Sequence, residues 1–101
     1  MVLEVAVLEV VAGQEDAFHA AFAEAQTIIS SMPGYIDHRL ARCMETPNRH
    51  VLLVNWETLV DHTEGFRGSP DYLRWKALLH HFYDPFPQVE HYETVFTHQA
   101  K

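Results

Sequence analysis

The chain has 101 residues, of which 48% are hydrophobic and 21% charged, a size and balance that fit one globular domain and exclude a two-domain enzyme. Its formal net charge of −7 repels phosphate backbones and excludes nucleic acid as a partner. No apolar run reaches the roughly 18–20 residues that span a bilayer, and no signal-peptide pattern opens the sequence. The single Cys43 has no intramolecular disulfide partner. We therefore predict a cytoplasmic protein with one domain over residues 1–101.

The first two elements are predicted from hydrophobic periodicity. Residues 2–11 are apolar on both alternating sets of positions except at two glutamates, which is typical of a strand covered on both faces. From Glu15 to Met32, apolar residues recur at spacings of three and four, which predicts an amphipathic helix. The following Pro33-Gly34 ends this helix, because proline cannot donate the next helical hydrogen bond.

Two further strands and a helix follow. Residues 35–46 and 50–57 are strand-like runs, and the Pro-Asn-Arg tripeptide around their junction is typical of a hairpin. Thr58 and Asp61 then resemble a capping box, which predicts a helix as far as Phe66.

The C-terminal region predicts one more helix and one more strand. Ser69-Pro70 offers an N-cap and a proline at the first helical position, and large apolar side chains continue at helical spacing to Phe82. Two prolines interrupt the chain after that helix, and residues 88–97 alternate as a last strand.

This order of elements predicts the fold. Strand, helix, strand, strand, paired helices and strand is the order of the ferredoxin-like α+β fold, a four-stranded antiparallel sheet with helices on one face. The first strand is apolar on both faces. If the open face stayed in water, the protein would lose the free energy of burying that apolar area, which is many kcal/mol at about 25 cal/mol per Å². We therefore predict that a second copy of the chain covers this face in a homodimer.

The eight histidines raise the question of a metal site. Adjacent His80 and His81 would point about 100° apart on a helix, and no His-x-x-x-His or Cys-x-x-Cys spacing occurs. His38, His62 and His91 could converge in space, but nothing in the sequence demands it. We therefore predict no metal site, and we interpret Cys43 as a small packing residue.

Aromatic rings with polar tips gather around the third strand and the helical pair. Large rings with a few hydrogen-bonding groups are typical of a pocket for a flat, partly polar organic molecule, although the same aromatics would also serve as core. A histidine or tyrosine in such a pocket would have a shifted pKa and would be a candidate general base. The predicted substrate-binding residues are Asn55, Trp56, Phe66, Arg67, Trp75 and Tyr83, and the predicted catalytic residues are His62, Tyr72 and His81.

Residues 52–58, the polar helix after them and residues 66–72 together resemble the signature region of the antibiotic biosynthesis monooxygenase (ABM) family. Trp56, Thr58, Ser69 and Tyr72 form the motif skeleton, and the resemblance extends over nearly the whole chain. The tail at residues 78–87 is similar to a subgroup named as monooxygenases without a known substrate.

The resemblance implies a dimeric α+β barrel with a pocket between sheet and helices in each protomer. It also implies oxidation of a phenol or hydroquinone of a small aromatic molecule by O₂, without metal, flavin or haem, the deprotonated substrate itself reducing oxygen. Trp56 and Tyr72 match pocket positions of the family and Asn55 adjoins one, whereas His62 and His81 are candidate bases on chemical grounds alone.

Two departures from the family pattern leave alternatives open. Phe66 falls where many relatives carry a histidine, which favours a non-catalytic dimeric module that binds a ligand or serves a stress response. The haem-degrading branch has an asparagine on the first strand and a histidine on the last helix, where this chain offers Ala6 and the pair Trp75-Lys76. Haem degradation is therefore disfavoured.

Overall fold

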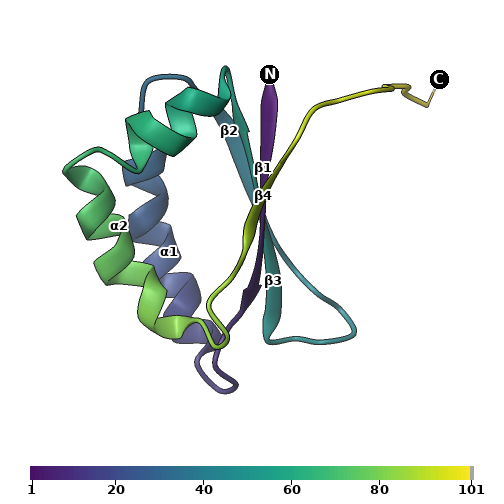
Figure 1. Ribbon diagram of the computed structural model, residues 1–101. Coiled ribbons are helices and arrows are strands. Elements are labelled where there is room, and N and C mark those ends of the chain that lie inside the picture. The colour runs from purple at the N-terminus through teal and green to yellow at the C-terminus, as the bar shows by residue number, and fades with distance from the viewer. Residues whose placement is uncertain (101) are drawn as a thin grey trace.

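The computed structural model describes residues 1–100, which form a four-stranded antiparallel sheet in the order β2-β3-β1-β4 with all helices on one face (Figure 1). This is the ferredoxin-like α+β fold that the element order predicts. None of the helices within residues 1–100 is both long and apolar enough to cross a membrane. The elements are β1 (Val2–Glu9), α1 (Glu15–Ile29), β2 (Tyr35–Arg42), β3 (Arg49–Trp56), the π-helical η1 (Asp61–Phe66), α2 (Asp71–Leu79), the 3₁₀-helical η2 (His80–Phe82) and β4 (Val89–Tyr92).

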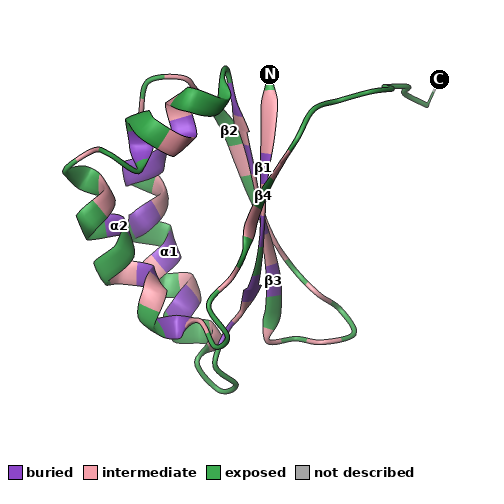
Figure 2. Ribbon diagram, in the orientation of Figure 1, coloured by how far each residue is buried: buried purple, intermediate pink, exposed green. Residues whose placement is uncertain are grey.

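The central strand β1 shows why the sheet has two different faces. Its alternate residues Glu4, Ala6 and Leu8 are buried toward the helices, whereas Val7 on the other face is 45% exposed. Successive strand residues point to opposite faces, so the helical layer seals one set only, and Figure 2 shows buried residues concentrated between the two layers. The outer face carries apolar side chains that no helix covers within residues 1–100.

The core fills the space between sheet and helices. Phe18 of α1 and Trp56 of β3 are fully buried, and Phe18 meets Phe82 edge to face with ring centroids 5.7 Å apart. Edge-to-face pairs of this kind add specific geometry to the burial of apolar area. The aromatic packing therefore fixes α1 and the end of the α2 region against the same sheet.

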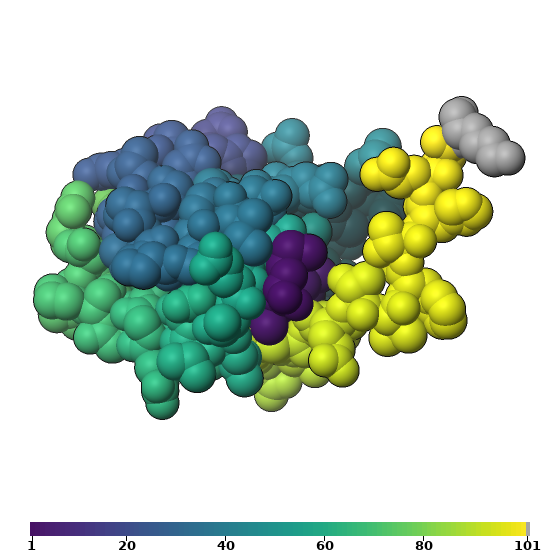
Figure 3. Space-filling view, turned by 90° about the horizontal axis from the view of Figure 1, so that it is seen from above, coloured from purple at the N-terminus to yellow at the C-terminus, as the bar shows by residue number. Residues whose placement is uncertain are grey.

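Three predicted boundaries are corrected. The strand predicted over residues 35–46 ends at Arg42, because the turn toward β3 begins there and the Cys43 N–H bonds across it to the Arg49 carbonyl. The first helix ends at Ile29 rather than Met32, because the N–H groups of Ser31 and Met32 bond three residues back instead of four. The last strand covers Val89–Tyr92 rather than residues 88–97. Tyr92 already pairs with Leu3, so β1 has almost no residues left to pair with a longer strand. Residues 93–100 project past the sheet on the side away from the helices (Figure 3).

A capping box precedes η1, as predicted. The Asp61 N–H donates to Thr58 Oγ1 and the Thr58 N–H donates to Asp61 Oδ2, both at 3.1 Å. Gly34, at a φ of +83°, lies directly against the Asp61 side chain, and a Cβ there would come within 2.2 Å of Asp61 Cγ. Glycine at this position therefore lets the capping box pack against the chain between α1 and β2.

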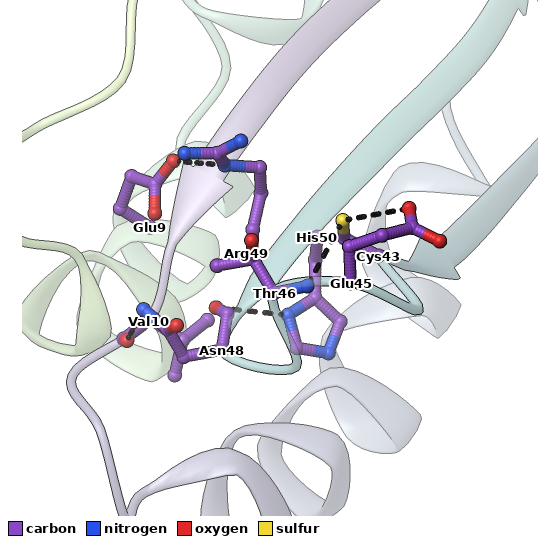
Figure 4. A network of polar contacts seen from close by, with 8 residues as sticks. All are labelled: Glu9, Val10, Cys43, Glu45, Thr46, Asn48, Arg49 and His50. Carbon is purple, nitrogen blue, oxygen red and sulfur yellow. Dashed lines mark hydrogen bonds and ion pairs between the residues drawn. The ribbon is translucent and has the colours of Figure 1, made fainter.

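The β2–β3 hairpin is tied to the end of β1 by a polar network (Figure 4). Arg49 Nε donates to Glu9 Oε1 at 2.6 Å, and the Asn48 side chain donates to the Val10 carbonyl at 3.1 Å. Cys43, interpreted from the sequence as a packing residue, accepts the Thr46 N–H at its Sγ within the turn. These contacts fix the register of β1 and β3 at the end of the sheet where the β2–β3 hairpin lies.

Candidate active site

A cavity of about 570 Å³ lies between the inner face of the sheet and the part of the helical layer formed by η1 and α2. Ala6, Leu8 and Leu52 form its floor because they occupy alternate inward positions of β1 and β3. Phe66 of η1 meets the Trp75 ring edge to face at 5.4 Å, and the two rings form part of one wall. The cavity therefore offers flat apolar surfaces of the kind that a ring-shaped ligand fills.

Glu4 places a buried carboxyl at this cavity. It is 5% exposed, and its Oε1 accepts the Trp56 Nε1–H at 3.0 Å while lying 3.3 Å from His62 Nε2. Burial raises the pKa of Glu4, since desolvation disfavours the charged form; the Trp56 hydrogen bond and the positive charge of Arg67 oppose the shift. Such a group holds and releases a proton nearer to neutrality than an exposed glutamate does.

His62 lies over Glu4, on η1. The imidazole is 2% exposed and stacks on the Trp56 indole, with centroids 5.4 Å apart and planes at 23°. Its Nδ1 lies 2.8 Å from Nε2 of His91, on β4. Burial, followed by the charges of Arg67 and His91, lowers the pKa of His62 to about 3. His62 is therefore a neutral hydrogen-bonding group at physiological pH and does not act as a cation.

Arg67 supplies positive charge at the same cavity. It is exposed, lines the cavity directly after η1, and lowers the pKa of both His62 and His91. A guanidinium at the rim of an apolar pocket favours anionic forms of whatever the pocket holds.

Tyr72 and Tyr83 bring two phenols to the cavity. Burial raises the pKa of each, and Glu4 adds to the shift at Tyr72. Both side chains are therefore protonated at neutral pH and act as hydrogen-bond donors. The catalytic role predicted for Tyr72 is then donation to a developing anion.

The structure brings most of the predicted site residues together. Asn55 and His81 lie apart from the cavity: Asn55 is on the outer sheet face, donating to Asp37 Oδ1 at 2.7 Å, and His81 is exposed beside Phe82. Trp56 lies behind Glu4 and His62 rather than on the cavity surface. The predicted residues that line the cavity are His62, Phe66, Arg67, Tyr72, Trp75 and Tyr83.

Two residues at the centre of the site are absent from the sequence prediction. The burial of Glu4 could have been predicted from the sequence. Glu4 alternates with Ala6 and Leu8 along the strand, so all three side chains point to the same, buried face. His91 carried none, because its place depends on the pairing of β4, in which it lies opposite Glu4. No group of three His, Cys, Asp or Glu side chains suited to a metal ion occurs within the described residues 1–100.

The fold and cavity define the class: a ferredoxin-like α+β domain with an aromatic-walled site between sheet and helices. Residues 1–78 match the family described as antibiotic biosynthesis monooxygenase. The chain belongs to that family, as the resemblance of its motifs predicted.

Three relatives show how far this likeness extends. YczJ, an uncharacterized protein of Bacillus subtilis strain 168, is 58% identical over 95 residues, which are 94% of this chain and 100% of YczJ. A Bordetella bronchiseptica structure, described as a candidate antibiotic biosynthesis monooxygenase, superposes with a TM-score of 0.89 at 34% identity over 94% of this chain and 97% of its own. SnoaB of Streptomyces nogalater, described as a cofactor-independent oxygenase, superposes with a TM-score of 0.71 at 22% identity over 99% and 94%.

Proposed function

We propose that this protein is a cofactor-independent monooxygenase that oxidises a small phenolic or quinol aromatic with O₂ in the cavity above β1. The observation that carries the proposal is the buried Glu4 carboxyl at a cavity walled by aromatic rings. Membership of the ABM family and the fold shared with SnoaB, a cofactor-independent oxygenase, support the same chemistry. The aromatic walls suit a flat ring system, and the polar groups gather around its acidic position.

In the proposed reaction Glu4 is the general base. Its carboxylate takes one C–H proton from the substrate, such as the methylene group of an anthrone, and leaves a carbanion conjugated with the ring carbonyl as an enolate. This anion reduces O₂, and a C–O bond forms to give a peroxide that takes up one proton. Loss of the second C–H proton and cleavage of the O–O bond produce the quinone carbonyl and one water. One oxygen atom enters the substrate, the other leaves as water, and the substrate supplies all four electrons.

The other polar groups have electrostatic roles in this scheme. Arg67 stabilises the substrate anion and the peroxide that follows it, because both carry negative charge in a site of low dielectric. Tyr72 and Tyr83, which stay protonated, donate hydrogen bonds to the same oxygens. Trp56 orients Glu4 from behind through its indole N–H.

Oxygen uptake by metal-stripped protein tests the proposal directly. The substrates are a panel of anthrones, naphthols and hydroquinones, and the variant is Glu4→Gln, which keeps the shape of the side chain and removes the base. We expect uptake above the spontaneous rate, and a loss of about 10²-fold or more in the variant, as is usual when a general base is removed. Glu64→Gln, at an exposed carboxyl of η1, is the matched control and should retain full activity.

The outcomes separate the candidate functions. Full uptake by Glu4→Gln would remove Glu4 from the mechanism. Saturable binding of these compounds without uptake would support the alternative, a dimeric ligand-binding module. Neither uptake nor binding would contradict both.

We also propose that the functional unit is a homodimer joined through the outer sheet face. Leu3, Val5 and Val7 of β1 lie beside Val51 and Leu53 of β3 on this face, and Val7 is 45% exposed. A second copy related by a two-fold axis would cover the stripe with its own. The apolar residues Val95 and Phe96, 78% and 93% exposed, line a shallow hollow together with Leu3 and Val5 of this face and would add to the contact.

A further inference from the structure

His62 lines the main cavity, and its neighbour His91 lines a second cleft of about 300 Å³. On one side its Nε2 lies 3.3 Å from Glu4 Oε1, inside the main cavity. On the other side its Nδ1 lies 2.8 Å from Nε2 of His91, which lines the second cleft together with Tyr92 and Glu93. One nitrogen of this buried imidazole therefore lies near a carboxyl of the main cavity, and the other contacts a residue that lines the second cleft.

We propose that Glu4, His62 and His91 form a proton relay that connects the main cavity with solvent at the second cleft. The inference deepens the proposed function, on which it rests for the role of Glu4 as base. Glu4 and His91 are direct cross-strand neighbours of β1 and β4, so both side chains project toward the helical layer, where His62 bridges them.

The transfer balances at each atom. The protonated Glu4 carboxyl gives its proton to His62 Nε2, while the His62 Nδ1–H bond breaks and that proton passes to His91 Nε2. His91, now doubly protonated, releases its Nδ1 proton to water in the second cleft. Glu4 is left as a carboxylate that accepts the Trp56 N–H and lies 3.3 Å from the newly protonated His62 Nε2, and the reverse transfers protonate it again. No electrons move, and one proton crosses from cavity to solvent.

The surroundings of His62 favour the passage of a proton through the imidazole ring over the binding of a second proton on it. The stacked Trp56, the positive Arg67 and the facing His91 all surround this imidazole, and its pKa falls to about 3. A second proton on His62 is therefore unfavourable at neutral pH, so a proton entering at one nitrogen is matched by one leaving at the other. His91, which is half-buried beside Glu93, is the member that meets water.

A filled cavity explains why such a route would matter. Glu4 is 5% exposed, and its remaining access to water is through the cavity it lines. An aromatic substrate in that space displaces the water, so the base would have no solvent contact on that side. The path through His62 and His91 leaves by a different opening.

Exchange of the His62 ring proton with water tests the relay without any substrate. The measurement is ¹⁵N-edited NMR of histidine-labelled protein, with His91→Phe and His91→Gln as variants. The relay predicts exchange at least about tenfold slower in both, because neither side chain passes a proton between two nitrogens. If His91 only supported the packing, its removal would loosen the site and exchange would be unchanged or faster. That result would overturn the relay.

A matched control is present in the same spectrum. The ring of His38 is held between Gln26 and Tyr35 on another part of the sheet, and its exchange should be equal in all three proteins. In the oxygenase assay with an anthrone, His91→Ala should lower kcat with KM unchanged, and added imidazole should restore it. Absence of uptake in the wild type would contradict the proposed function, whereas the exchange experiment would still decide the relay.

Discussion

At the scale of single residues, the site is characterised by opposite pKa shifts of a buried carboxyl and a buried imidazole. The buried Glu4 keeps its proton more readily than an exposed glutamate, and the buried His62 keeps a proton less readily than an exposed histidine. The pair is held in this state by Trp56, whose N–H stabilises the carboxylate and whose ring covers the imidazole. Opposed shifts of two neighbouring titratable groups are typical of acid–base sites.

Trp56→Phe tests the hydrogen bond to Glu4. The substitution keeps an aromatic ring and removes the N–H donor that lowers the pKa of Glu4, so that pKa should rise further. The measurement is an infrared titration of the carboxyl band, assigned by its loss in Glu4→Gln. Trp75→Phe, which has no bond to Glu4, should leave the titration unmoved. An unchanged midpoint in Trp56→Phe would show that the bond does not control Glu4.

His62 predicts a loss of stability in acid. Its pKa is lowered on folding from 6.5 to about 3, so its contribution is fully present above pH 6.5 and is lost as pH falls toward 3. Glu4, with a raised pKa, acts in the opposite sense and takes up its proton more readily in the folded state. We expect His62→Gln to flatten the acid limb of unfolding free energy against pH, measured by urea denaturation, and Glu4→Gln to steepen it. Parallel curves for all three proteins would contradict this.

At the scale of elements, most of the fold could be predicted because hydrophobic period and cap chemistry are local. The spacing in α1 and the Thr58–Asp61 box both predicted what the structure shows. The end of β4 could not be predicted, because it is set by where β1 begins and not by residues 93–97 themselves. The same dependence on pairing kept His91 out of the predicted site. Phe66, in contrast, was assigned to the pocket as one of the aromatic rings around the third strand and the helical pair, and it lines the cavity.

Thr58→Ala should weaken η1, the segment that carries His62. The Asp61 N–H loses its acceptor, and loss of a cap of this kind costs about 1 kcal/mol of unfolding free energy. Chemical denaturation measures the change. Thr63→Ala, within the same segment, removes a hydroxyl that donates to the Leu59 carbonyl and should change stability by less than about 0.5 kcal/mol. Equal effects of the two substitutions would show that the box is not the source of stability.

At the scale of the whole molecule, the covered and uncovered sheet faces would separate the proposed chemistry from the proposed assembly. The inner face positions Glu4 and the cavity floor, whereas the outer face holds an apolar stripe. Asn55, although adjacent to Trp56 in sequence, therefore belongs to the outer face with Asp37. Residues that are adjacent in a sequence motif are read as one site, but adjacent residues of a strand point to opposite faces of the sheet.

Val7→Asp should convert the proposed dimer to monomers. The new carboxylate would be buried against the second copy, where an unpaired charge is costly, and Val7 contributes nothing to the inner core. Sedimentation velocity measures the change, with circular dichroism to confirm that the protomer stays folded. Leu73→Asp, at an exposed position of α2, is the control and should remain dimeric. A wild-type monomer at micromolar concentration would refute the assembly outright.

The order β2-β3-β1-β4 leaves two strand edges with unpaired backbone groups, and such edges invite uncontrolled growth into larger aggregates. The β2 edge has a register shift between Tyr35 and Asp37 and charged side chains at Arg39 and Arg42, which hinder pairing with another strand. The β4 edge is only four residues long, too short to template a strand. With both edges blunted, the outer face is the surface left for the proposed association, and edge-to-edge growth into a larger sheet is disfavoured.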